Sequence, residues 1–170
     1  MWGKKLIESV PSHVISFGTS PLREGEDSVL ISYEPSAGRD SIELVLHGEK
    51  ESYDLKGSLL FGRHTRMNIA ASVAAARVMG VQAETIRSAL EEAKPLEHRI
   101  ELFHKSSGAI FINDSKSTTV ASTCAAVETA LEAFSGRRII LMIGGLAKRS
   151  SWEPLMSLID WNRDAFKAIL

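Results

Sequence analysis

The amino-acid sequence predicts an α/β fold, in which antiparallel β strands and two helices over residues 1–94 precede a second part, residues 95–170, where strands and helices alternate. Three observations lead to this prediction. Short runs rich in β-branched residues, separated by turn residues, occupy about positions 10–60. Two segments with apolar residues three and four apart follow them. Beyond Pro95, strand-like and helix-like segments take turns, which is typical of a parallel sheet.

Four segments near the N-terminus are predicted to be half-exposed antiparallel strands: HVISFG, SVLISYE, SIELVLHG and SYDLKG. The third alternates most clearly, because Ile42, Leu44 and Leu46 point to one side of a strand and the residues between them point to the other. The intervening segments TSPLREGED and EPSAGRD carry Pro, Gly and charge, as surface loops do.

The two helices are predicted from apolar spacing and from their ends. In NIAASVAAARVMG, a stripe formed by Ile69, Val73 and Ala76 runs along one face, and Gly80 is placed to end the helix. In AETIRSALEEAKP the same spacing recurs until Pro95, which cannot continue a helix. We therefore expect a domain boundary at about residues 94–96.

The second half of the chain is predicted to form a parallel sheet. A strand, a helix and a further strand follow each other at a spacing that requires a right-handed crossover, and this connection makes the two strands parallel. The expected strands are residues 109–113, 138–143 and 165–170, with a preliminary strand in ELFHKSSG, and the expected helices are residues 120–134 and 152–159.

Composition excludes several classes of protein. The chain has 20 basic and 21 acidic residues and a net charge of -1, which gives no electrostatic reason to expect nucleic acid or an anionic membrane as a partner. It contains one cysteine, Cys124, and five histidines without the spacing of a metal site, so we expect neither disulfides nor a bound metal. A cytoplasmic location fits best, because no export signal or membrane-spanning apolar run occurs.

Polar residues follow two of the predicted parallel strands. The segment NDSKSTT (113–119) leads into the helix that begins near Val120, and GGLAKRS (144–150) leads into the next helix. Ligands of parallel sheets bind at the carboxyl ends of the strands, beside helix N-termini that favour negative charge. If the two strands are neighbours, Lys116 and Lys148 face one crevice, and the expected ligand is an anion.

Simpler interpretations of these residues stay open. Asp114, Ser115 or Ser117 could cap the helix, and the glycines of GGLAKRS could be ordinary turn residues. Lys148 alone would most often belong to a solvated loop. A cap explains one polar residue and leaves both lysines unexplained, so the joint placement favours a binding site.

Two further segments are weaker candidates. In GRHTRMN, His64 and Asn68 are four residues apart and share a face if the segment is helical, although a core or capping role is the simpler interpretation. HRIE (98–101) would usually be a surface ion pair. The chain has neither the G-x-x-x-x-G-K-[ST] phosphate loop nor a G-x-G-x-x-G dinucleotide motif, and Cys124 falls on an apolar helix stripe, where an inert thiol is expected.

Taken in order, these four segments resemble motifs of the Mur ligases, the ATP-dependent enzymes that form the amide bonds of peptidoglycan. The family patterns are G-x-H-N-x-x-N, H-R-x-E, N-D-S-K-A-T-N and G-G-x-x-K. The chain matches them except at Thr65 and Thr119, which replace Asn, and at Ser117, which replaces Ala. The D-S-K-x-T element is the specific one, and it is similar to that of the members that add D-glutamate.

The resemblance implies a domain assignment and an activity. Residues 1–94 are expected to be the C-terminal part of the central ATP-binding domain, and residues 95–170 the N-terminal half of the Rossmann-like C-terminal ligase domain. The complete enzyme would add D-glutamate to UDP-N-acetylmuramoyl-L-alanine through an acyl phosphate, using ATP and Mg²⁺. The phosphate loop and the metal ligands would lie outside this chain, which we therefore expect to be inactive by itself.

The resemblance also implies roles for individual residues. Asn68, together with His64, would contact the nucleotide from the central domain. Arg99 and Asp114 would hold its phosphate and ribose. Lys116 would be the catalytic residue, because it would neutralise the phosphoryl group in transfer. Two more residues, Thr118 and Lys148, would bind the carboxylates of D-glutamate.

Two other classes of function remain as hypotheses. The chain could be a non-catalytic interaction module that associates with a second copy through open sheet edges. It could also be a small Rossmann-like anion-binding protein without any part in peptidoglycan synthesis.

Overall fold

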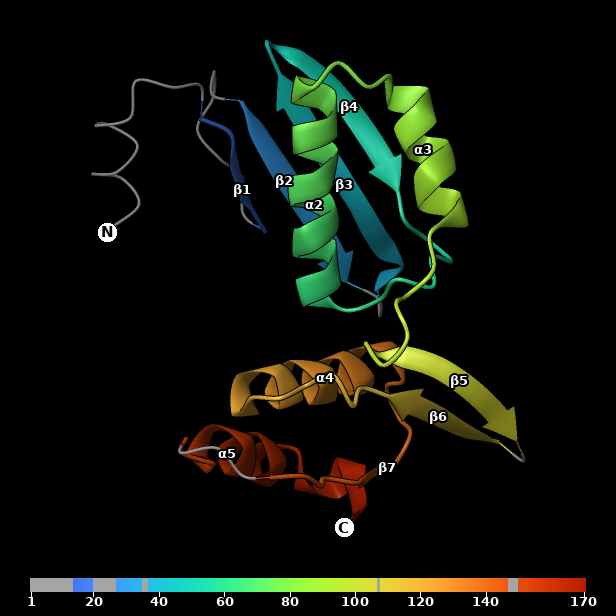
Figure 1. The fold of residues 1–170 in the computed structure, drawn as a ribbon, viewed down its shortest axis with the longest axis vertical. Helices are drawn as coiled ribbons and strands as arrows, with labels where there is room; N and C mark the ends of the chain where they lie inside the picture. Colours follow the sequence, from blue (N-terminus) through green and yellow to red (C-terminus); the bar gives the residue numbers. More distant parts are fainter. Residues whose placement is uncertain (1–13, 20–26, 35–36, 107, 147–149) are drawn as a thin grey trace. The chain divides into compact units, whose positions relative to one another are not determined.

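The computed structural model describes residues 14–19, 27–34, 37–106, 108–146 and 150–170. The chain divides into two compact units (Figure 1). The first unit contains the described residues up to Ser58 together with Arg66–Glu92, and the second contains Leu59–Thr65 and Ala93–Leu170. Together they confirm the predicted α/β fold class.

The first unit is built on a four-stranded sheet with the order β1-β2-β3-β4. The pairs β2–β3 and β3–β4 are antiparallel, as predicted, but β1 pairs with β2 in parallel, with Ser16 opposite Ser28. Alternation of side chains fixes which face each residue occupies and leaves the direction of the neighbouring strand open, so the antiparallel prediction was wrong for β1. The strands are β1 Ser16–Gly18, β2 Ser28–Glu34, β3 Arg39–Leu46 and β4 Glu49–Asp54.

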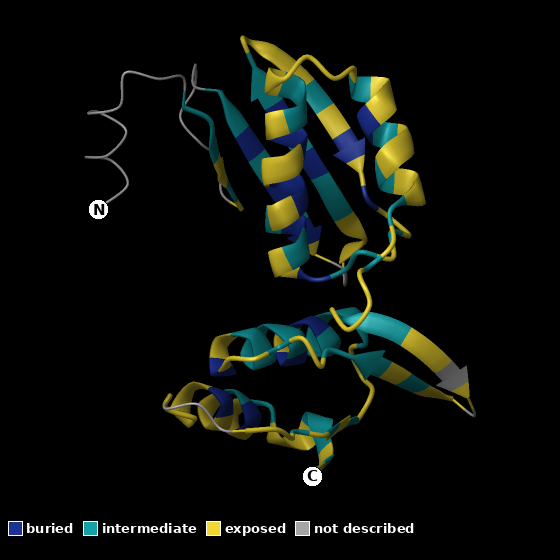
Figure 2. Ribbon diagram, in the orientation of Figure 1, coloured by how far each residue is buried: buried dark blue, intermediate teal, exposed yellow. Residues whose placement is uncertain are grey.

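Helices α2 (Arg63–Val78) and α3 (Ala83–Glu92) lie on one face of this sheet (Figure 1). The predicted alternation is confirmed, because Ile42 and Leu44 are fully buried and Leu46 is half-buried. Figure 2 shows the buried residues gathered where the sheet and α2 meet. The core residues of this unit are Val29, Ile31, Tyr33, Ile42, Leu44, Tyr53, Leu55, Ile69, Ala70, Val73, Ala74 and Ile86.

A charged pair is buried among these apolar residues. Arg66, on α2, is 1% exposed, and its Nε donates to Oδ1 of Asp40 at 2.6 Å. A second guanidinium nitrogen bonds the other carboxylate oxygen, and the guanidinium carbon lies 5.4 Å from the centre of the Tyr33 ring. The pair joins the second turn of α2 to the start of β3. A helix pattern with arginine at this position predicts a solvated side chain, so this contact depends on the tertiary fold.

The second unit contains two small sheets and two α helices. The antiparallel pair β5–β6 and the parallel pair β7–β8 are its sheets, and helices α4 and α5 pack on each other through Val120, Val127, Leu155 and Ile159. Its elements are β5 Glu101–Ser106, β6 Ala109–Asn113, α4 Val120–Ala133, β7 Ile139–Leu141, α5 Glu153–Trp161, the 3₁₀ turn η2 Arg163–Ala165 and β8 Phe166–Ile169.

The expected parallel pairing of β6 with β7 does not occur among the described residues. β6 pairs with β5 as a hairpin, and β7 pairs in parallel with β8 across the crossover through α5. A helical connection makes two strands parallel only if both join the same sheet, and chain order does not guarantee that they do. The predicted parallel relation is therefore confirmed between the second and third expected strands, β7 and β8, and is wrong for β6.

The segment Leu59–Thr65 packs against the second half of α4. A Cβ atom at Gly62, where φ is +97°, would lie 2.5 Å from Oγ1 of Thr129. The Phe61 and Phe134 rings meet edge to face at 5.7 Å. Position 62 thus requires glycine for two reasons, the positive φ angle and the lack of space for a side chain beside Thr129. None of the helices in the described ranges has the length and apolar character needed to cross a membrane.

Candidate functional site

Two of the predicted motifs lie against each other in the second unit. The segment His98–Glu101 precedes β5, and Asn113 ends β6, directly opposite Glu101 in the hairpin. The backbone N–H of Lys116 donates to the carbonyl of His98 at 3.1 Å, and the backbone N–H of Ile100 donates to Oδ1 of Asp114 at 2.9 Å. The sequence therefore folds HRIE and NDSK into one polar network.

Two residues of this network have left-handed backbone conformations. The φ angles are 66° at His98 and 48° at Ile100, and a β-branched residue rarely adopts a positive φ. Each such conformation costs about 1–3 kcal/mol, so surrounding contacts must hold it. The backbone N–H of His98 donates to Oε2 of Glu101 at 2.8 Å, and Asp114 accepts from Ile100, so both strained residues are held by carboxylates.

Asp114 is bonded within the chain through both carboxylate oxygens. Oδ1 accepts from the N–H of Ile100 and Oδ2 accepts from the hydroxyl of Ser117, while the backbone carbonyl of Asp114 accepts from Ser117 N at 2.9 Å. A carboxylate has about four acceptor positions, so two remain for a ligand. In this structure Asp114 joins the segment before β5 to the loop after β6.

The side chains of Arg99 and Lys116 are exposed at this network. Neither side chain forms a hydrogen bond or ion pair with a residue in the described ranges, while the backbone N–H groups of Arg99 and Lys116 donate to the carbonyls of Leu96 and His98. Two cations that are not neutralised by neighbouring carboxylates form a surface suited to an anion such as a phosphate or a carboxylate. Arg99 and Lys116 are thus the exposed cations that the described residues place on this network.

The polar segment ends at the N-terminus of α4. Thr119 caps this helix, because its hydroxyl accepts from Ser122 N at 3.2 Å while the Ser122 side chain bonds back to Thr119 N. The alternative in which Asp114, Ser115 or Ser117 caps the helix is therefore wrong. Thr118, expected at the D-glutamate site, is exposed beside the cap.

The remaining predicted residues lie elsewhere. His64 is exposed on the first turn of α2, in the segment packed at Thr129, which is ten residues or about 15 Å along α4 from the Thr119 cap. Asn68 is exposed on α2 in the first unit, and its carbonyl accepts from Ser72 Oγ at 2.9 Å. Lys148 lies outside the described residues. The structure therefore groups Arg99, Asp114, Lys116 and Thr118, and the expected pairing of Lys116 with Lys148 stays a prediction.

Sequence inspection missed His98, Glu101 and Asn113 as members of the site. A signal was present, because SSG between two strand-like segments indicates a hairpin. The turn alone does not give the exact pairing, because the register shifts at a bulge between Leu102 and His104, and this shift brings Glu101 opposite Asn113. The left-handed conformations had no comparable signal, since neither His98 nor Ile100 is a glycine.

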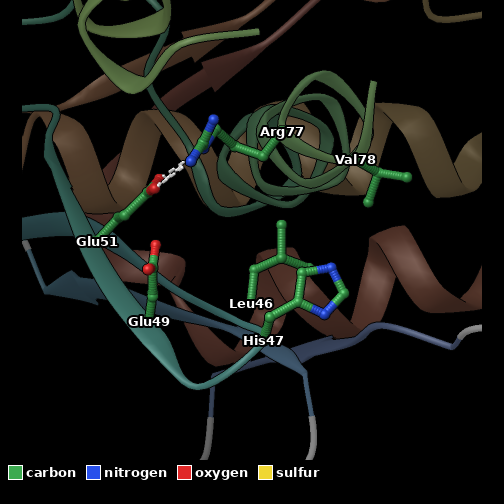
Figure 3. A pocket seen from close by; sticks show the side chains of 6 residues that line it. All are labelled: Leu46, His47, Glu49, Glu51, Arg77 and Val78. Atoms are coloured by element: carbon green, nitrogen blue, oxygen red, sulfur yellow. Dashed lines mark hydrogen bonds and ion pairs between the residues drawn. The ribbon is translucent and has the colours of Figure 1, made fainter. Parts of the chain in front are cut away.

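A cavity of about 280 Å³ lies in the first unit, between the β3–β4 hairpin and the end of α2 (Figure 3). Arg77 donates there to Glu51 at 2.6 Å, and this bond lowers the pKa of Glu51. Tyr53 donates to Glu51 at 2.5 Å, and burial raises the pKa of Tyr53 to about 12. The cavity is lined by Leu46, His47, Glu49, Glu51, Arg77 and Val78, none of which belongs to a predicted motif. Arg77 and Glu51 pair with each other in this cavity, which favours a structural role for both.

Within the ranges that the structure describes, no group of three or more His, Cys, Asp or Glu side chains is placed to hold a metal ion. The described part of the chain thus does not supply a complete ligand set for Mg²⁺.

Comparison with curated proteins finds close sequence relatives. The chain is 35% identical over 149 residues to the UDP-N-acetylmuramoylalanine–D-glutamate ligase of Anaeromyxobacter dehalogenans, a match that spans 86% of this chain and 31% of that protein. It is 43% identical over 101 residues to the ligase of the same name from Pasteurella multocida, covering 59% of this chain and 23% of that protein. The chain thus spans about a third or less of the length of these relatives. No family model matches it.

A solved structure supports the fold. The crystal structure of MurF from Acinetobacter baumannii matches with a TM-score of 0.59 and 23% identity, over 90% of this chain and 36% of that one. At this identity the match concerns the fold alone. The motifs, the sequence relatives and the fold agree, and the chain therefore belongs to the Mur ligase family.

Proposed function

We propose that this chain is part of a cytoplasmic ATP-dependent ligase that adds D-glutamate to UDP-N-acetylmuramoyl-L-alanine through an acyl phosphate, in peptidoglycan synthesis. The names of the sequence relatives support the reaction, and the D-S-K-x-T element supports the amino acid. The observation that carries the proposal is the exposed pair Arg99 and Lys116, held on one polar network without neutralising partners in the described residues.

The geometry suits catalysis that depends on placing reactants and on neutralising charge. Phosphoryl transfer spreads negative charge over the oxygens of the moving group, and cations that are already in position stabilise it. Lys116 would contact the transferring phosphoryl group, and Arg99 would contact the nucleotide phosphate. Because both loops are fixed by hydrogen bonds, the cations need little reorganisation when the substrate binds.

The other substrate contacts are assigned by motif position. Thr118 and Lys148 would hold the carboxylates of D-glutamate, and Asn68 with His64 would contact the nucleotide. Asp114 retains free acceptor positions for a ribose hydroxyl. Mg²⁺ would supply charge neutralisation when bound with ATP, and its ligands are expected beyond the residues of this chain.

The domain assignment belongs to the same proposal. Residues 1–94 would be the C-terminal part of the central ATP-binding domain, and residues 95–170 the N-terminal half of the Rossmann-like C-terminal domain. The chain by itself would then bind anions weakly and would not catalyse the ligation, since it would hold only part of the nucleotide and amino-acid contacts.

A titration with pyrophosphate, followed by ¹⁵N NMR on this chain, tests the proposal. We expect the largest amide shifts at residues 98–101 and 114–119, and about a tenfold weaker affinity in Lys116→Ala and Arg99→Ala. Lys56→Ala and Arg138→Ala remove exposed cations outside the network and are the matched controls. Shifts confined to other parts of the chain, or equal losses in the controls, would overturn the proposed site.

One observation favours a second function, self-association. One face of the β7–β8 sheet exposes Ile140 at 54%, and Met142, one residue beyond β7, is 77% exposed. Parallel sheets are usually covered on both faces, so a second copy could cover this one. Sedimentation at several concentrations tests this. A monomer throughout the range argues against it, and Met142→Lys should abolish any dimer that forms.

A further inference from the structure

The orientation of the Asn113 side chain can be deduced from its neighbours. The backbone N–H of Ser115 can only donate, and it faces Asn113 at 3.1 Å, so the atom that it contacts is the amide oxygen. The amide nitrogen therefore points the other way, toward Nδ1 of His98 at 2.8 Å and Oε2 of Glu101 at 3.4 Å. The carboxylate oxygen of Glu101 can only accept, and Nδ1 of His98 is able to accept. Both contacts therefore agree with an amide nitrogen that points toward them.

This orientation determines where the proton of His98 lies. Because Asn113 donates to Nδ1, that nitrogen must accept through its lone pair, and the proton of the neutral ring is on Nε2. A protonated ring would carry N–H groups on both nitrogens. Two donors would then face each other, and either Asn113 would rotate and lose Ser115 or the ring would move away.

We propose that Asn113 and Asp114 are positioning residues that hold Arg99 beside Lys116, and that the hold requires a neutral His98. The inference rests on the proposed anion-binding function of these two cations. Asn113 bonds the His98 ring, and Asp114 bonds the N–H of Ile100, so the two side chains anchor the residues on either side of Arg99.

The physical reason is the backbone conformation of the anchored segment. His98 and Ile100 both have positive φ angles, and an unanchored chain would relax toward the more populated regions. Relaxation at either residue would redirect the side chain of Arg99 between them. The bond from Lys116 N to the His98 carbonyl makes the same segment a support for the second cation.

Four charged groups set the balance around His98. The Glu101 carboxylate lies 3.8 Å from Nδ1. The other three are Asp114 on the loop after β6 and the two cations Arg99 and Lys116, whose segments are bonded to residues 98 and 100. The informative quantity is therefore the direction in which anion affinity changes as the pH falls. A role of His98 as a charge alone and a role in positioning predict opposite directions.

The first experiment locates the proton of His98 in the wild-type chain. Long-range ¹H–¹⁵N NMR correlations distinguish a protonated ring nitrogen from one that only accepts. At neutral pH we expect the proton on Nε2 and a bare Nδ1. A proton on Nδ1 would overturn the inference, and this measurement does not depend on any variant or ligand.

The second experiment measures the anchors. In Asp114→Ala we expect the Ile100 amide to exchange its hydrogen at least about tenfold faster, because it loses a charged acceptor. Asp114→Asn keeps an acceptor oxygen and should show a smaller change. Ser115→Ala is the matched control, since it retains the backbone N–H that fixes Asn113. Unchanged exchange in both Asp114 variants would contradict the proposal.

The third experiment uses sulfate, which keeps its charge between about pH 8 and pH 5. If His98 acted only as a charge, its protonation would strengthen sulfate binding as the pH falls. Positioning predicts the opposite sign in the wild type, a weakening of about tenfold, and a reversal in Asn113→Ala, where the bond to the His98 ring is already absent at every pH. Stronger sulfate binding by the wild type as the pH falls would refute the positioning role. If the wild type binds neither sulfate nor pyrophosphate, the proposed function fails, and the proton position and amide exchange still decide the positioning roles.

Discussion

Gly62 and Thr129 approach each other so closely that a single added carbon on Gly62 would lie 2.5 Å from the Thr129 hydroxyl oxygen. Thr129 is 2% exposed, and its hydroxyl donates to the carbonyl of Ala125 at 2.8 Å, so it has little room to move. This contact packs the segment before α2 onto α4 and makes Gly62 a structural position of the G-x-H motif.

Gly62→Ala should therefore destabilise the chain. The positive φ and the overlap together should lower the free energy of unfolding by about 2–4 kcal/mol, measured by urea denaturation. Gly57→Ala, at a φ of +79° with open space around it, isolates the conformational part and should cost about 1 kcal/mol. Thr129→Ala should rescue part of the loss at Gly62. Equal effects at Gly57 and Gly62 would show that the contact is unimportant.

Ile100→Gly should cost unusually little for a half-buried isoleucine. Glycine adopts a φ of 48° without strain, so the relief of about 1–3 kcal/mol offsets the lost apolar contact and the added chain entropy. Ile112→Gly, also half-buried but in strand β6, has no strain to relieve and should lose about 2–4 kcal/mol. Urea midpoints of the two variants provide the comparison, and a loss at Ile100 as large as that at Ile112 would contradict the strain.

Asp40→Ala should be strongly destabilising. It removes the carboxylate that pairs with the buried guanidinium of Arg66, and breaking a buried pair costs about 3–5 kcal/mol. Asp54→Ala removes an exposed carboxylate that bonds the N–H of Lys56 and should cost about 1 kcal/mol or less. Thermal and urea unfolding measure both. Similar losses in the two variants would mean that Arg66 finds another acceptor.

Tyr53 should make the stability of the first unit sensitive to alkaline pH. Its pKa is raised from 10.0 to about 12, first by burial and then by its bond to Glu51, so the folded state favours the neutral phenol. Its contribution is complete below pH 10 and is lost as the pH rises toward 12. The urea midpoint of the wild type should fall in this range more steeply than that of Tyr53→Phe. If the urea midpoints of the two proteins fall equally with pH, Tyr53 is not the group responsible.

The sequence determined the local structure and the family. Alternation in SIELVLHG placed Ile42 and Leu44 in the core, and Gly80 ended α2 with a φ of 85°, because these features depend on residues within one or two turns of each other. The order of four short motifs was enough to indicate the Mur ligases, which the sequence relatives confirm.

The tertiary structure decided which distant segments meet. It made β1 parallel to β2, paired β7 with β8, buried Arg66 against Asp40, and joined His98 to Asn113. The physical reason is that side-chain periodicity encodes only which face a residue presents. The choice of partner strand, and the contacts that hold a strained backbone, depend on groups far apart in the chain that come together only when the whole unit packs.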